Sequence, residues 1–65
     1  MITWSTTGDV TRSADGRWLL LHYDGRSLVY RCRETAAPVL VAQRSNREEA
    51  KAAAEALTWG YRVSP

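Results

Sequence analysis

The segment from residue 15 to residue 33 constrains the fold most, because it contains two β-forming runs separated by Asp24-Gly25. A two-residue type I′ turn needs positive φ at both central positions, which Asp and Gly tolerate. With these two residues in the turn, Tyr23 lies opposite Arg26 and the register of the hairpin is fixed. The sequence therefore predicts an antiparallel β-hairpin at the centre of the fold.

This register divides the side chains of the hairpin between two faces. One face carries the pairs Leu21 with Leu28, Leu19 with Tyr30 and Arg17 with Cys32, and the other carries His22 with Ser27, Leu20 with Val29 and Trp18 with Arg31. The first face is the more apolar, so we expect a helix to cover it. The second face would then remain without a covering layer.

Turn signals divide the rest of the sheet. Residues 3–7 are rich in β-forming residues, and Gly8-Asp9 leaves open whether this strand ends there or continues to Arg12. Residues 39–43 form a compact apolar run, preceded by Pro38, which cannot donate to a ladder and is typical of the start of a strand. With the central hairpin, these segments predict an antiparallel sheet of three or four strands.

A helix follows the last strand. Ser45 with Glu48 three residues later forms a capping box, and the alanine-rich residues 49–58 favour a helix that ends at Gly60. One face of this helix carries Ala50, Ala53, Ala54 and Leu57. Small side chains allow close packing, so the sequence predicts an α+β fold with one C-terminal helix packed on one face of the sheet.

The chain has 65 residues, which predicts one small domain over residues 1–65. A chain of this length buries only about 60% of the surface that its unfolded form exposes, so a second copy could add stability and a homodimer is plausible. A single cysteine excludes an internal disulfide and fits a reducing, cytoplasmic location. No apolar run is long enough for a membrane span, and the first residues do not resemble a signal peptide.

The sequence offers little for catalysis. Ser27, His22 and Asp24 surround one tight turn, where we expect no pocket or oxyanion hole, so we predict that the chain is not an enzyme. His22 is the only histidine and Cys32 the only thiol, so we predict no metal site. The glycines match no phosphate or dinucleotide loop, so we predict no cofactor.

Charge is distributed unevenly along the chain. Between residues 10 and 47 there are seven arginines and three acidic residues, whereas Glu48, Glu49 and Glu55 lie on the predicted helix. The chain has eight arginines and one lysine, a bias that suits phosphate and base recognition by the guanidinium group. A GC-rich coding sequence would give the same bias. The pattern predicts a basic sheet that could bind DNA.

The second face of the hairpin is a candidate contact surface. Exposed together, Trp18, Leu20 and Val29 would form an apolar patch of the kind that binds a partner. Arg31, opposite Trp18, could stack on the indole and form a flat platform beside Arg33. The alternative is that residues from the ends of the chain fold over this face. The aromatic residues that could do so are Trp4, Trp59 and Tyr61.

Four short motifs support a family resemblance over residues 8–57. They are Gly8-Asp9-Val10, Asp15-Gly16-Arg17-Trp18, Asp24-Gly25-Arg26 and Ser45-Asn46-Arg47-Glu48-Glu49-Ala50. In this order the chain resembles the AP2-like, arm-type DNA-binding domain of phage tyrosine integrases. The resemblance implies a three-stranded sheet in the major groove, buttressed by a helix, with Arg17, Trp18, Arg31 and Arg33 facing DNA. No recombinase catalytic domain is matched, so recombinase activity is not implied.

Two functions remain open for a small non-enzymatic binding module. The first is DNA binding through the basic face of the sheet, and the alternative is a protein-interaction module, such as a regulator or inhibitor encoded by a phage or mobile element. The candidate binding residues are Arg17, Trp18, Leu20, Val29, Arg31 and Arg33. Arginines that converge on one sheet face favour nucleic acid, whereas an apolar patch with arginines around its rim favours protein.

Overall fold

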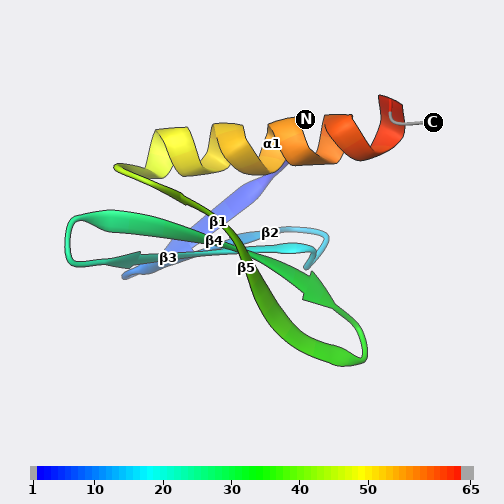
Figure 1. The fold of residues 1–65 in the computed structure, drawn as a ribbon. Helices are drawn as coiled ribbons and strands as arrows, with labels where there is room; N and C mark the ends of the chain where they lie inside the picture. The colour runs from blue at the N-terminus through cyan, green and yellow to red at the C-terminus, as the bar shows by residue number, and fades with distance from the viewer. Residues whose placement is uncertain (1, 64–65) are drawn as a thin grey trace.

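The computed structural model describes residues 2–63, with side chains for residues 2–58. An antiparallel sheet lies against a single C-terminal helix (Figure 1). The elements are β1 (Trp4–Thr7), β2 (Val10–Ser13), β3 (Trp18–Tyr23), β4 (Arg26–Arg33), β5 (Ala36–Arg44) and α1 (Arg47–Val63). The strands lie side by side in chain order, from β1 to β5. The predicted α+β class is confirmed, but the sheet has five strands instead of three or four.

The central hairpin has the predicted register. Asp24 and Gly25 have φ angles of 52° and 71°, as a type I′ turn requires, and Tyr23 pairs with Arg26. The pairing continues without a shift to Trp18 and Arg31 at the other end of β3. The Asp-Gly turn therefore fixes which residues of β3 and β4 are cross-strand neighbours.

The fifth strand results from a turn that the sequence left open. Gly8 adopts a φ of 59°, and Thr7 pairs with Val10 across the Gly8-Asp9 turn. The first β-forming segment is therefore folded into the hairpin β1–β2 instead of forming one strand. A left-handed glycine between two short extended runs is the physical reason for this division.

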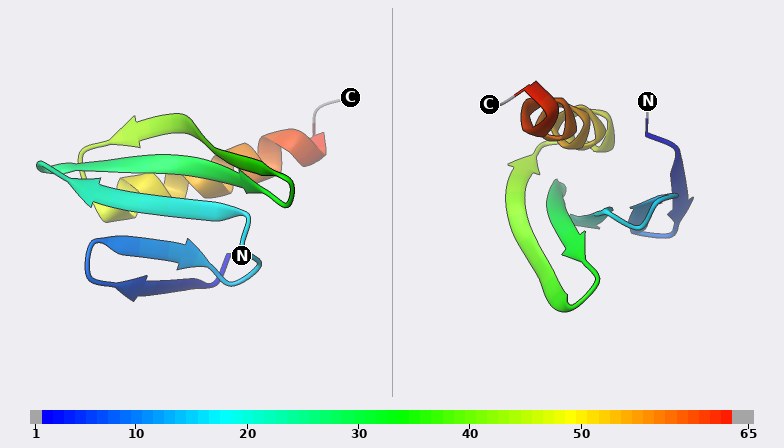
Figure 2. Two further views of the ribbon diagram at one scale, coloured as in Figure 1. Left: turned by 90° about the horizontal axis from the view of Figure 1, so that it is seen from below. Right: turned by 90° about the vertical axis from the view of Figure 1, so that its right-hand side faces the viewer.

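Strand β5 begins earlier than predicted. It starts at Ala36, so the β4–β5 turn is short and Pro38 lies inside the strand. Proline is tolerated there because β5 is an edge strand, whose outer side has no hydrogen-bonded neighbour in the sheet. Register shifts occur between Val29 and Tyr30 and between Arg31 and Arg33, and β5 is visibly curved (Figure 2). Proline and irregular pairing protect this edge from pairing with another strand.

The helix begins and ends differently from the prediction. The side-chain Oδ1 of Asn46 accepts the backbone N–H of Glu49 at 2.9 Å, so Asn46 is the capping residue instead of Ser45. The helix continues through Gly60 to Val63, so the predicted end at Gly60 is wrong. Asn and Ser are both strong caps, which is why the sequence alone did not distinguish these adjacent positions.

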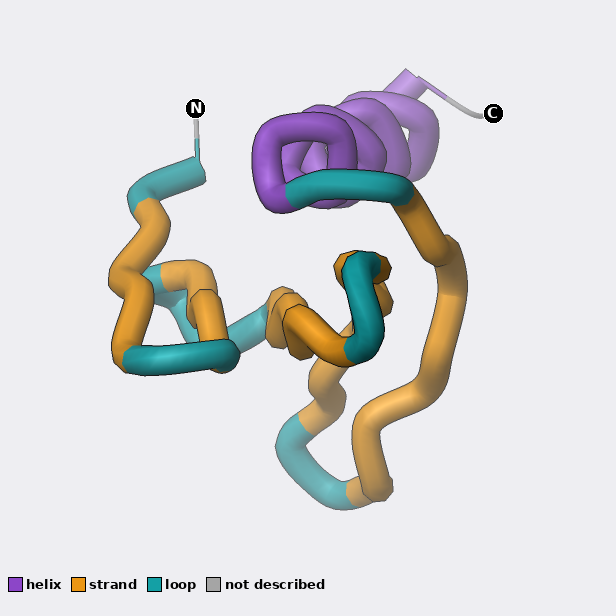
Figure 3. Tube along the Cα trace, turned by 90° about the vertical axis from the view of Figure 1, so that its left-hand side faces the viewer, coloured by secondary structure: helices purple, strands orange, loops and turns teal. Residues whose placement is uncertain are grey.

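The helix covers the opposite sheet face from the one expected. Trp18, Leu20 and Val29 are buried and form the core with Ala50 and Ala54 of α1. In Figure 3 the helix lies over the central strands, between the two edges of the sheet. The expectation that α1 covers the face with Leu19, Leu21, Leu28 and Tyr30 is wrong.

Small polar side chains are buried on the helix side of the sheet. They are Thr11, Ser13 and Ser27, and α1 packs on β3, β4 and β5 on this same side. Their hydroxyl groups are satisfied locally. Ser13 Oγ accepts the backbone N–H of Trp18 at 2.9 Å and donates to Asp15 at 2.7 Å. The alanine face of the helix packs close to the sheet, and the large indole of Trp18 fills the remaining space.

Candidate functional site

The sheet face opposite the helix is the main candidate site, and we call it the outer face. No further layer of the described chain lies on this side of the sheet (Figure 1). Cross-strand pairing places the following residues on it: Val10, Leu19, Leu21, Leu28 and Leu40, the aromatic residues Tyr23 and Tyr30, the basic residues Arg12 and Arg26, and the uncharged polar residues Ser5, Thr7 and Gln43. The outer face thus combines aliphatic, aromatic and basic side chains with a few uncharged polar ones.

The apolar residues of the outer face are covered only in part. Leu19, Leu21 and Leu28 are half-buried by their neighbours in the sheet, and none of them belongs to the core cluster. Leu40 is 51% exposed and Tyr23 is 75% exposed. Apolar side chains from four strands are therefore partly open to solvent, which is typical of a contact surface. We call this group the leucine stripe; its members are Val10, Leu21, Leu28 and Leu40.

Basic groups flank the leucine stripe on opposite sides. Arg12 lies opposite Leu19 in the β2–β3 pair, and Arg26 lies opposite Tyr23 in the β3–β4 pair. Both side chains are exposed, and no ion pair involves either of them among the residues with described side chains. Arg17 lies just before β3, close to Asp15. The hydrogen bond from Ser13 lowers the pKa of the Asp15 carboxyl group, and the backbone N–H and the charge of Arg17 lower it further.

The sequence-predicted contact patch is wrong. Trp18 is 4% exposed, and Leu20 and Val29 are fully buried, so these three residues form the core and not a binding surface. The predicted stacking is present, because the guanidinium carbon of Arg31 lies 5.8 Å from the centre of the Trp18 ring. The buried indole nevertheless offers no platform to a ligand.

The sequence left open the alternative that residues from the chain ends cover the face with Trp18, Leu20 and Val29, and the structure agrees with it in part. Trp4 packs against the core cluster together with Ile2 and Leu57. The side chains of Trp59 and Tyr61 lie outside the described residues.

The predicted arginines do not converge. Arg31 lies on the helix side with Trp18, whereas alternation along β3 puts Arg17 on the side of Leu19. Arg33 lies near the β4–β5 turn, at the far end of the bent hairpin. The site that sequence reasoning missed is the leucine stripe with Arg12 and Arg26, and the small buried residues of the other face were the signal that could have located it.

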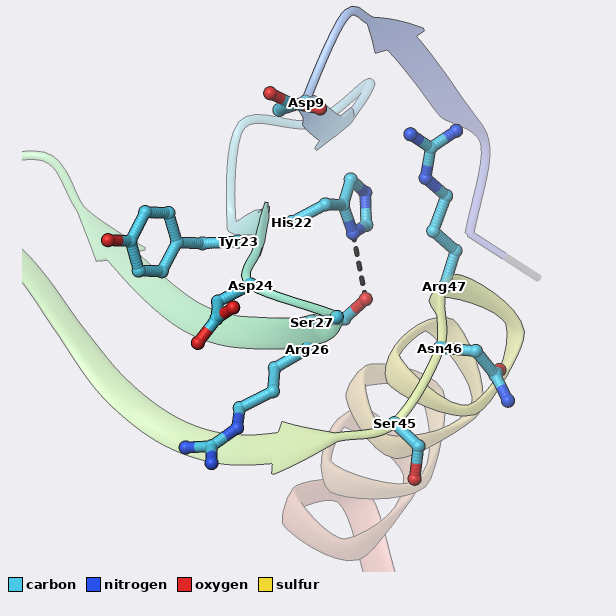
Figure 4. Close-up of a pocket in the computed structure, with 10 residues that line it drawn as sticks. Asp9, His22, Tyr23, Asp24, Arg26, Ser27, Ser45, Asn46 and Arg47 are labelled. Atoms are coloured by element: carbon cyan, nitrogen blue, oxygen red, sulfur yellow. Dashed lines mark hydrogen bonds between the residues drawn. The ribbon is translucent and has the colours of Figure 1, made fainter.

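An open pocket of about 460 Å³ lies where the β3–β4 turn approaches the start of α1 (Figure 4). The imidazole of His22 is engaged on both sides, with Nδ1 2.8 Å from Ser27 Oγ and Nε2 3.1 Å from Thr11 Oγ1. Burial lowers the pKa of His22, and the nearby charge of Arg47 lowers it further. His22 therefore acts as a neutral link between strands β2, β3 and β4.

This pocket does not contain the arrangement of a serine nucleophile. Ser27 is 2% exposed, so its hydroxyl group is hidden from a substrate. Both ring nitrogens of His22 bond to hydroxyl groups and not to a carboxylate. In Figure 4 the carboxylate of Asp24 points away from His22. The Ser27–His22 contact is thus a structural hydrogen bond, which lacks the carboxylate orienter of a catalytic triad.

Three further observations bound the site. No group of three or more His, Cys, Asp or Glu residues that could hold a metal ion occurs in the described part of the chain. Within residues 2–63, no helix is long and apolar enough to span a bilayer. Comparisons with protein-family models, with curated proteins and with solved structures found no match.

Proposed function

We propose that this chain is a small non-enzymatic binding module that docks a protein through the outer face. The observation that carries the proposal is the leucine stripe with unpaired Arg12 and Arg26 on its two sides. The centre of a protein interface is apolar and poor in charge, and interfaces are enriched in arginine and tyrosine and depleted of lysine. The outer face has this composition.

The small core supports the same proposal. Apart from alanines, only Trp18, Leu20 and Val29 are buried hydrophobic residues in the described part of the chain. The outer face carries more large apolar side chains than this core. In a domain of this size, covering that face with a partner would add a substantial fraction of the total apolar burial.

DNA binding is the second candidate, favoured by the charge of the sheet. The five strands contain five arginines and no acidic residue. The resemblance to integrase arm-type domains would direct such a sheet toward a major groove. Against this, Arg31 lies on the helix side, and leucines occupy the centre of the outer face, where groove contacts would need polar groups. We therefore favour a protein partner.

The test is affinity capture from a nuclease-treated extract of cells that express the chain. Wild type is compared with the double variant Leu21→Lys/Leu28→Lys, which adds two charges to the centre of the outer face. The matched control is Ala52→Lys/Ala56→Lys, which adds the same charge at exposed positions of α1. We expect wild type and control to retain the same protein partner and the outer-face variant to lose it, with circular dichroism showing that all three are folded.

Duplex DNA is tested in parallel by fluorescence titration at several salt concentrations. Binding of DNA with a log-log salt slope of about −0.9 for each phosphate contacted, in the absence of a captured protein, would contradict the protein proposal and support the second candidate. Charge reversal of Arg12 and Arg26 would then reduce the slope.

A further inference from the structure

We infer, on the basis of the proposed function, that the protein partner presents an apolar stripe flanked by carboxylates about three helical turns apart. The inference starts from the position of the acidic residues. All seven lie outside the strands, in turns or on α1: Asp9, Asp15, Asp24, Glu34, Glu48, Glu49 and Glu55. The strand residues of the outer face therefore offer no acidic counterpart to its own arginines.

The two unpaired arginines define a distance. Arg12 is the pairing partner of Leu19, and Arg26 is the partner of Tyr23, so the two lie four residues apart along β3 and one strand to either side of it. With about 3.4 Å per residue and about 4.8 Å between strands, their Cα atoms are roughly 16 Å apart. A helix rises 1.5 Å per residue, so about 11 residues, or three turns, cover this distance.

The side chains that lie between Arg12 and Arg26 indicate which side chains the partner presents between its two carboxylates. Leu21 and Leu28 form a cross-strand pair at the centre of the outer face, with Val10 beside Leu21. These aliphatic groups match a stripe of leucine-like side chains. Arginine binds a carboxylate with two parallel hydrogen bonds, so each of the two arginines favours an Asp or Glu of the partner.

The same charges disfavour other occupants. A second copy of the chain would bring another acid-free, arginine-bearing sheet face against this one, and like charges at an interface are unfavourable. The bent β5 edge with Pro38 also disfavours joining two sheets edge to edge. The outer face is therefore complementary in charge to an acidic surface on a different protein.

The test uses four probes and protein labelled with ¹⁵N. Three are helical peptides of about 15 residues that share one leucine stripe and differ at two positions 11 residues apart, which carry Glu, Gln or Lys. The fourth is a short DNA duplex. We expect the Glu peptide to shift the amide signals of the outer face and to bind roughly tenfold more tightly than the Gln peptide. The Lys peptide should bind more weakly still.

Charge exchange provides the matched variants. In Arg12→Glu/Arg26→Glu the preference should reverse, so that the Lys peptide binds more tightly than the Glu peptide. The control Arg44→Glu/Lys51→Glu has the same net charge, with Lys51 changed on α1 and Arg44 opposite the buried Ser27. This control should keep the preference for Glu.

Each other result overturns a defined part of the account. Equal binding of the Glu and Gln peptides to the outer face would contradict the acidic partner and leave protein docking intact. Binding of the duplex to the outer face while no peptide binds there would contradict both. Outer-face shifts that depend only on protein concentration, with a dimer in sedimentation, would replace the acidic partner with a second copy.

Discussion

The indole Nε1 of Trp18 donates a hydrogen bond of 3.1 Å to Thr58 Oγ1, and that hydroxyl group donates to the carbonyl oxygen of Ala54 at 2.9 Å. Trp18 is the first residue of β3 and Thr58 lies in the second half of α1, so the contact joins segments 40 residues apart. It satisfies the one polar group of the largest core side chain and helps to fix α1 on this face of the sheet.

Thr58→Val should lower the free energy of unfolding by about 1–3 kcal/mol, because it leaves the Trp18 N–H without its partner at a mostly buried position. Thr58→Ser keeps the hydroxyl group and should cost clearly less. Urea unfolding followed by tryptophan fluorescence measures both. Equal losses for the two variants would show that the hydrogen bond contributes nothing.

Leu20→Ala should destabilise the protein by about 2–5 kcal/mol, because it removes a fully buried side chain from the core beneath α1. Leu21→Ala makes the same chemical change on the neighbouring, half-buried outer face and should cost clearly less. Thermal melts of the two variants rank the sites. A larger effect at Leu21 would contradict the placement of the helix.

The neighbours within the hairpin could be predicted from sequence, but the buried face could not. Asp24-Gly25 determines the register by local backbone geometry, which does not depend on the rest of the fold. Both faces of β3 and β4 carry apolar side chains, and the face that is the more apolar in sequence is not the one that α1 covers. The helix packs on β3, β4 and β5, where its small residues Ala50 and Ala54 meet the core side chains of the hairpin. The residue pattern of the hairpin alone does not specify this contact.

The wrong contact patch has the same cause as the wrong buried face. Trp18, Leu20 and Val29 were expected at the surface only because the helix was expected on the other side. The stacking of Arg31 on Trp18 was predictable because it depends on cross-strand pairing alone. Its burial was not, because burial depends on the packing of a distant helix.

Asn46→Ala should destabilise the protein by about 0.5–2 kcal/mol, because the cap of the Glu49 backbone N–H is lost at the start of α1. Ser45→Ala, one residue earlier, should have almost no effect. Chemical unfolding of the two variants separates the caps. If Ser45→Ala is the more damaging, the helix begins one residue earlier than described.

Stability should fall as the pH drops below 6.5, owing to His22. Burial lowers the folded-state pKa of His22 below its ordinary value of 6.5, the charges of Arg47 and Lys51 act in the same direction, and Asp9 opposes them. Between the folded pKa and 6.5 the unfolded chain binds more protons, so stability rises with pH there and is fully present above 6.5.

Melting temperatures measured from about pH 7.5 to about pH 5 test this dependence, since carboxyl groups titrate mostly below that range. His22→Gln retains hydrogen-bonding groups without a titrating ring and should remove the change in this window. A wild-type melting temperature that is constant or rises on acidification would contradict the depressed pKa.

Photo-crosslinking in cells that express the chain tests the central claim most directly. A photoreactive phenylalanine derivative replaces Leu21 on the outer face or, as control, Ala52 on the exposed side of α1. The account predicts a specific protein adduct from position 21 and none from position 52. Adducts only from position 52, or only nucleic acid crosslinked at position 21, would contradict the outer face as a protein-binding surface.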